Sequence, residues 1–326
     1  SASESEEHSC ASQHPIKDED LEFVLKLYNN FHLSRSHIKK IIEDTKAFLD
    51  NKSNCENSFN LLVSEYKTMQ LLTRENLFVT PKSVPLSYDQ TSKGCQKTIN
   101  AQYISIASTF KNVLSSGSLL DIASNYMKTC NNHIHDVKDG ENFRDLGPNT
   151  FPFIIFFDEF ETGNPLGSHK GIHKLGVMYI SLRCFPPHYY SKLRNIYLCA
   201  LFPSSVRCNI DPVLLTLVDE INMLQSDGIS IGSKKLFFKF TGFTGDNLGL
   251  NQILGFVESF SANYSCRMCK VTRQDSMKMT KENIQILRNT DNPFDGSISN
   301  DYPLQGGAYF DVMGFHSYPH FDGRDR

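Results

Sequence analysis

Two strongly apolar segments that end in carboxylates constrain the fold of this chain more than any other feature. The first is a run of large apolar side chains at residues 153–157, followed at once by Asp158, Glu159 and Glu161. Such a run, apolar on both alternating faces, is typical of a fully buried strand. The second segment, residues 234–250, contains a similar strand that leads into Asp246. Because a strand end holds an acid rigidly while exposing it to a substrate, Asp158 and Asp246 are candidate functional residues.

The order of the apolar segments predicts a mixed α/β core. Three strands are expected first, then a helix, a fourth strand and a second helix, at residues 153–157, 175–182, 196–201, 213–224, 236–240 and 248–260. Asp211 and Pro212 suit the N-cap and the first position of the first helix. The short intervals between the first three strands favour antiparallel neighbours. The helix then provides a crossover to a strand parallel to the first. This order fits a ribonuclease-H-like mixed sheet with flanking helices, preceded by a helical N-terminal region.

Composition and pattern divide the chain into five regions. Residues 1–20 are an acidic tail that is expected to be disordered, and residues 21–75 are a helical region. Residues 76–150 are a connector with a small α/β segment, residues 151–270 are the core, and residues 271–326 are an unassigned tail that is expected to be poorly packed. Two helices are expected within residues 21–49 and a third at 57–74. The connector is expected to be irregular over residues 76–97, with a short strand at 103–106 and an interrupted helix at 109–127.

The first two helices also have the outline of a helix-turn-helix motif. The second helix opens with a basic cluster that includes Arg35, Lys39 and Lys40. In that motif the second helix enters the major groove of DNA. An ordinary helical hairpin with a solvated basic face explains the same residues, and we favour it because helix pairs are common and the cluster is small.

Charge and cysteine content restrict the class of protein. The net charge of −3 gives no global sign of nucleic-acid binding, so such a function must depend on local patches. No segment is long and apolar enough to span a membrane. The polar, acidic N-terminus does not resemble a signal peptide. The nine scattered cysteines are an odd number, which favours reduced thiols in an intracellular compartment.

Acids at the ends of two neighbouring strands suggest metal chemistry. Mg²⁺ prefers hard oxygen ligands and retains several waters, so two or three carboxylates are sufficient to bind it. Asp158 and Asp246 suit a nuclease site of this kind if their strands are adjacent. Glu159 is the weaker candidate because it points to the opposite face if its strand continues. The alternative is structural: both aspartates cap turns or helices, and Asp246 is well placed as an N-cap.

A Cys-x-x-Cys pair follows the second acid. Cys266 and Cys269 are half of a zinc site, and two further ligands are needed. His316 and His320 have a suitable spacing and would have to bind from a loop, because Pro319 lies between them. A pair of free thiols remains the alternative to zinc.

The segments around these residues resemble transposases of the CACTA (EnSpm) type. The similarity is strongest in FFDEFETGNPLGSHKGIHKLG, TGDNLG, GFVESFS and CRMC, within residues 153–269. These transposases have a ribonuclease-H-like domain with a DDE/D acid set. The resemblance implies that Asp158 and Asp246 are the first two acids, that Mg²⁺ is the cofactor, and that DNA strands are cleaved and transferred. It also implies nuclear localisation and a DNA partner, with no membrane and no small-molecule substrate, and it leaves the oligomeric state open.

The sequence also departs from the family pattern. The family's third acid lies in a later helical segment, and no matching segment follows residue 289. We therefore expect a truncated, catalytically incomplete protein. Two other interpretations remain. One is a non-enzymatic DNA- or protein-binding module, in which residues 21–49 and a basic segment with Lys170 and Lys174 contact phosphates. The other is a non-functional gene fragment.

Overall fold

The computed structural model describes most of the chain as two compact units, Ser1–Phe78 and Val79–Arg326. The described residues are 18–30, 32–52, 59–90, 96–115, 117–128, 136–140, 143, 146–147, 149–163, 173–205, 210–254, 256–259, 261–281 and 283–286. No helix in these ranges is long and apolar enough to cross a membrane.

The first unit consists of helices, as the sequence predicts. Helices α1 (Asp18–Tyr28) and α2 (Arg35–Lys52) are followed by α3 (Phe59–Leu62) and α4 (Glu65–Arg74). Their apolar faces share a small core that includes Val24, Ile38, Ile42, Phe59 and Leu62. Isolated helices of this length are only marginally stable in water, so the packing of their apolar faces in this core stabilises them.

The prediction of one helix at residues 57–74 is wrong. The helix is interrupted between α3 and α4, and Ser64 occupies the N-cap position of α4. The buried Thr68 hydroxyl donates a hydrogen bond to the Leu62 carbonyl oxygen over 2.8 Å, so an acceptor at the end of α3 is satisfied without a continuous helix. The spacing of apolar residues in the sequence does not show this break, because apolar residues of both helices belong to the same core.

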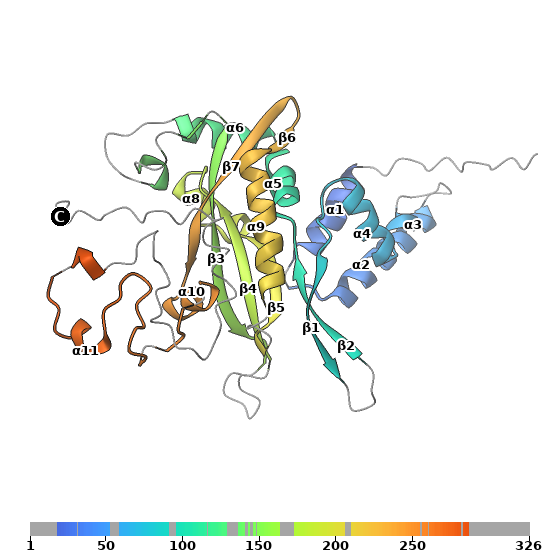
Figure 1. Cartoon of the computed structure of the whole chain (residues 1–326). Helices are drawn as coiled ribbons and strands as arrows, with labels where there is room; N and C mark the ends of the chain where they lie inside the picture. Colours follow the sequence, from blue (N-terminus) through green and yellow to red (C-terminus); the bar gives the residue numbers. More distant parts are fainter. Residues whose placement is uncertain are drawn as a thin grey trace, which may run out of the picture. The chain divides into compact units, whose positions relative to one another are not determined.

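The second unit is built on a seven-stranded mixed sheet (Figure 1). The strand order is β1-β2-β5-β4-β3-β7-β6. The strands are β1 (Lys82–Gln90), β2 (Gln96–Tyr103), β3 (Thr150–Glu161), β4 (Lys174–Leu182), β5 (Tyr197–Pro203), β6 (Ile229–Ile231) and β7 (Lys234–Gly245). Pairs β3–β4 and β4–β5 are antiparallel, whereas β7 lies parallel to β3. The predicted antiparallel neighbours and the parallel fourth strand are confirmed.

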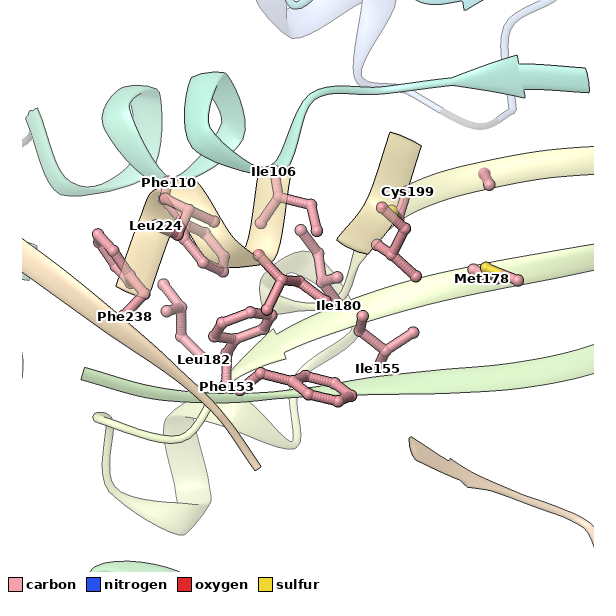
Figure 2. Packing of buried hydrophobic residues seen from close by; sticks show 14 of the residues in the cluster. Ile106, Phe110, Phe153, Ile155, Met178, Ile180, Leu182, Cys199, Leu224 and Phe238 are labelled. Atoms are coloured by element: carbon pink, nitrogen blue, oxygen red, sulfur yellow. The ribbon is translucent and has the colours of Figure 1, made fainter. Parts of the chain in front are cut away.

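Helices cover one face of this sheet. The crossover before β7 is α9 (Asp211–Ser226), and α5 (Ile106–Ser115) and α6 (Gly117–Lys128) precede β3. Figure 2 shows Phe110 of α5 and Leu224 of α9 among strand side chains such as Phe153 and Phe238. The Phe110 and Phe238 rings are stacked with their centroids 4.7 Å apart. Burial of these large apolar side chains is the main stabilising contribution to the unit.

One carboxylate fixes the start of α5 against α9. Glu220 of α9 accepts hydrogen bonds from the hydroxyls of Tyr103 and Ser105 and from the backbone N–H groups of Ile106 and Ala107. These N–H groups belong to the first turn of a helix, where no intrahelical acceptor exists. Burial is the main cause that raises the pKa of Tyr103 far above its ordinary value, with Cys199 and Glu220 adding to it, so the hydroxyl remains a donor.

Four predictions around this sheet are corrected. Residues 76–97 are not an irregular connector, because β1 pairs with β2 from Lys82↔Tyr103 to Gln90↔Gln96. No strand runs over residues 103–106, where β2 ends and α5 begins. The helix predicted at 248–260 is shorter: α10 is Asn247–Ile253. The N-cap of α9 is Ile210, one residue before the predicted Asp211.

The remaining elements are short. They are the 3₁₀ helix η1 (Val137–Asp139), α8 (Pro187–Tyr190), the 3₁₀ helix η2 (Leu193–Asn195), α11 (Arg273–Ser276) and the 3₁₀ helix η4 (Ile284–Ile286). Residues 271–286 connect back to the preceding segment: the Lys270 N–H donates to the Ile286 carbonyl oxygen, and the Arg273 N–H to that of Asn263. Residues 287–326 of the predicted tail lie outside the described part of the chain.

Candidate functional site

The pairing of β3 with β7 brings the two predicted acids next to each other in register, where β7 ends. The last register pair of these parallel strands is Phe157↔Gly245, and the next residues are Asp158 and Asp246. Both aspartates are exposed. Neighbouring strands lie about 4.8 Å apart. The condition set by the sequence, that the two acids belong to adjacent strands, is therefore met.

Each aspartate already uses one carboxylate oxygen in a local hydrogen bond. Asp158 Oδ1 accepts from the Glu159 N–H over 2.8 Å, and Asp246 Oδ1 accepts from the Gly249 N–H over 2.6 Å. The second bond makes Asp246 the N-cap of α10, as predicted. These bonds orient the carboxylates. The other oxygen of each accepts no hydrogen bond from the residues that the structure describes.

Two glycines allow β7 and α10 to approach β3 closely beside Asp246. A Cβ atom on Gly245 would lie 2.6 Å from the Phe157 carbonyl oxygen. One on Gly249 would lie 2.9 Å from Asp246 Oδ1 and 2.9 Å from Phe157 Cδ1. Neither glycine was predicted as a site residue, although both flank the acid in the segment TGDNLG. A glycine beside an acid is a signal of close backbone approach.

Glu159 is turned away from this pair, as expected if β3 continues through it. The strand extends to Glu161, so successive side chains alternate between faces. Glu159 Oε2 forms an ion pair with Lys174 Nζ, with side-chain exposures of 12% and 40%. Its Oε1 is buried and has no hydrogen-bond partner among the described residues. Glu159 therefore belongs to the other face and does not join Asp158 and Asp246.

The acid pair has the composition of a partial magnesium site. Two free carboxylate oxygens on adjacent strands suit a hard cation that keeps most of its waters. Within the described ranges, no group of three or more His, Cys, Asp or Glu side chains is arranged to hold a metal ion. The fit is thus to one weakly held Mg²⁺, and a full two-metal arrangement would need a further acid.

The cysteine pair is half-buried and locally ordered. Cys266 Sγ accepts a hydrogen bond from the Met268 N–H at 3.3 Å. Cys266 and Cys269 do not form part of a cluster of three ligands among the described residues. His316 and His320, the candidate partners, lie outside these residues. Zinc binding here stays a prediction.

The predicted DNA-binding residues of α2 have acidic neighbours. Arg35 Nε lies 3.7 Å from Glu65 Oε1, and its guanidinium carbon is 4.7 Å from the centroid of the Tyr28 ring. Lys39 Nζ lies 3.7 Å from Glu43 Oε1, whereas Lys40 is exposed. Exposed pairs of this kind are weak and do not prevent a phosphate from competing for the cation.

The second predicted basic segment is only partly described. Lys174 pairs with Glu159, and Lys170 lies outside the described residues. Phosphate binding by either lysine remains a prediction.

No protein-family model matches the chain, and no curated protein matches it significantly.

Proposed function

We propose that this chain is a transposase-derived DNA-processing protein of the CACTA (EnSpm) type, with a ribonuclease-H-like core. The observation that carries the proposal is the placement of Asp158 and Asp246 one residue beyond the last pair of two neighbouring parallel strands. The order β5-β4-β3-β7, with antiparallel β5, β4 and β3 and with α9 before β7, supports this type of sheet. Nuclear localisation is part of the same proposal.

The residues of this chain would orient and hold the cation. Asp158 and Asp246 would each offer the oxygen that is not used in a backbone hydrogen bond. When bound, Mg²⁺ would stabilise charge on the attacking and leaving oxygens of a phosphodiester. Because no third acid joins the pair among the described residues, we propose weak binding of one metal and no strand transfer by this chain alone.

Metal binding should raise the thermal stability of the chain, and the acid pair should be responsible. With Mg²⁺ or Mn²⁺ at about 100 times its dissociation constant, we expect about 2.7 kcal/mol of stabilisation. In a unit of this size that corresponds to a rise in Tm of about 5–10 °C. The double substitution Asp158→Asn/Asp246→Asn should abolish the rise, as measured by circular dichroism.

The control for this titration is Asp219→Asn, which changes an exposed carboxylate on α9 and should retain the full rise. No rise in the unaltered chain, or an equal rise in the double variant, would contradict the proposed metal site.

Strand cleavage gives a separate test of catalytic incompleteness. Incubation of the purified chain with supercoiled plasmid and Mn²⁺ should give no nicking above a buffer control, because the acid set lacks a third member among the described residues. Nicking that disappears in Asp246→Ala would show that the site is complete, whereas nicking retained in Asp246→Ala would indicate a contaminating nuclease.

A binding module without catalysis is the second candidate. The exposed Lys40 favours it, and the acidic neighbours of Arg35 and Lys39 weaken it. The gene-fragment interpretation receives no support from the second unit, whose buried core is continuous across the sheet and helices α5, α6, α9 and α10.

A further inference from the structure

Strand β7 has one more residue than β3 between two of their paired positions. Phe153 pairs with Phe240 and Ile155 pairs with Phe243, so β3 advances by two residues while β7 advances by three. The extra residue falls at Thr241 and Gly242, which we call the 241–242 bulge. Gly242 has a φ of 140°, a backbone conformation that is natural only for glycine. Bulges are uncommon between parallel strands.

The bulge reverses which residues of β7 face the core. Leu236, Phe238 and Phe240 alternate into the core in the usual way. Phe243 is also buried, although it lies three residues after Phe240, and the two rings meet edge to face with centroids 5.3 Å apart. In an unbroken strand, residues three apart point to opposite faces. The alternation of β7 is therefore shifted by one residue before the strand ends.

This shift decides the position of Asp246. If the pairing of Phe153 with Phe240 continued in step, Asp246 would lie opposite Glu159, on the face that Asp158 does not share. With the extra residue, Gly245 pairs with Phe157 and Asp246 follows opposite Asp158.

The bulge is supported by side chains on both sides. The Thr241 hydroxyl donates to the Phe153 carbonyl oxygen over 3.0 Å, at the point where the regular pairing is interrupted. The Phe240 N–H donates to Gln225 Oε1 of α9 over 3.3 Å. These bonds satisfy backbone groups that an irregular strand would otherwise leave unpaired. In the described part of the chain, no heavy atom beyond the two adjacent residues lies within 4 Å of a Cβ built on Gly242, so its backbone conformation, and not lack of space, requires glycine.

We infer that the 241–242 bulge is a positioning device that sets the register of β7 so that Asp246 faces Asp158. Gly242 and Thr241 are positioning residues, since neither is itself one of the two acids. That this register serves metal binding rests on the proposed function. The register itself is independent of that function, and it is tested without metal.

Paired cysteines report the register directly. A disulfide needs Cα atoms about 4.4–6.8 Å apart and side chains directed towards each other. We therefore compare Asp158→Cys/Asp246→Cys with Glu159→Cys/Asp246→Cys, both in a background with Cys266→Ser and Cys269→Ser. After mild oxidation of the full chain, the linked peptides are quantified by mass spectrometry. The 158–246 link should exceed the 159–246 link by at least about tenfold, because only the first pair shares a face.

Insertion of one alanine between Thr244 and Gly245, downstream of the bulge, should reverse this preference. If the 241–242 bulge sets the register, it still accommodates one extra residue, and the inserted residue moves Asp246 from opposite Asp158 to opposite Glu159. The 159–246 link should then become dominant while circular dichroism shows a retained fold. Gly242→Ala is the matched control: it keeps the residue count, so the 158–246 link should persist despite a loss of stability.

Two outcomes would overturn the inference: a dominant 159–246 link in the chain without the insertion, or a dominant 158–246 link in a folded insertion variant. If the insertion prevents folding, the comparison in the chain without the insertion still decides the register. A failed metal titration together with the expected links would reject the proposed function alone.

Discussion

Glu220→Ala should destabilise the second unit by about 3 kcal/mol, because it leaves four hydrogen-bond donors without their acceptor. The Tyr103 and Ser105 hydroxyls lose a charged partner, and the first turn of α5 loses the group that satisfies its N–H groups. Water can reach part of this half-buried site, which keeps the loss below the sum for four fully buried groups. For a unit of this size, Tm should fall by about 6–12 °C.

The measurement is thermal and urea unfolding followed by circular dichroism, since the chain has no Trp to serve as a fluorescence probe. Glu220→Gln should cost less, because an amide oxygen still accepts from one side of the site. Asp219→Ala, at an exposed neighbouring position of α9, should change the free energy of unfolding by less than about 0.5 kcal/mol. Equal losses for Glu220→Ala and Asp219→Ala would show that the hydrogen bonds contribute little.

The core strands were predictable because their apolar residues reflect burial directly. Strand β3 has Phe153, Ile155 and Phe157 in the core, and no helix of ordinary polarity has so dense an apolar run. The antiparallel and parallel pairings followed from the lengths of the connections. The position of Asp246 at the end of β7 could be predicted on the same grounds. The prediction that the first strand ends before Asp158 is wrong, because β3 continues through Asp158 to Glu161 by pairing with β4.

Strand β1 was missed because it has little apolar pattern. Among the described strands it pairs with β2 alone, at the edge of the sheet, and it contains Pro85 beside a register shift. Proline lacks a donor and is tolerated at such an edge, whereas sequence patterns treat it as a sign of a loop.

The early end of α10 depends on tertiary contacts. The buried Asn251 side chain donates to the carbonyl oxygens of Val257 and Ser265, and the backbone carbonyl oxygen of Asn251 accepts from the Phe256 N–H. These bonds fold the following segment back over the helix end. An apolar periodicity in the sequence has no means of showing them.

The relation between the two acids was only half predictable. Sequence can place an acid after a strand, but a shift of one residue moves a side chain to the other face. That register depends here on a bulge at Thr241 and Gly242. The two glycines around Asp246 are a sequence signal of the close approach, but they do not show what is approached.

Gly245→Ala should weaken metal binding by about tenfold to a hundredfold, since it displaces Asp246 without changing either acid. The added Cβ would lie 2.6 Å from the Phe157 carbonyl oxygen, and this oxygen belongs to the backbone of the paired strand. The end of β7 must therefore move away from β3 at the pair immediately before the acids. Overpacking at such a contact costs about 2 kcal/mol.

Gly163→Ala is the matched control, at the same end of β3 as the acids. Its added Cβ would have only ordinary contacts, 3.7 Å from His173 Cδ2 and 3.9 Å from Glu161 Oε1. Thermal-shift titration with Mn²⁺ gives the affinities of both variants, and unfolding without metal gives their stabilities. If Gly245→Ala loses stability but binds Mn²⁺ as tightly as Gly163→Ala, the close approach stabilises the sheet and does not position Asp246. If it loses both, the spacing of β3 and β7 at this pair controls the site.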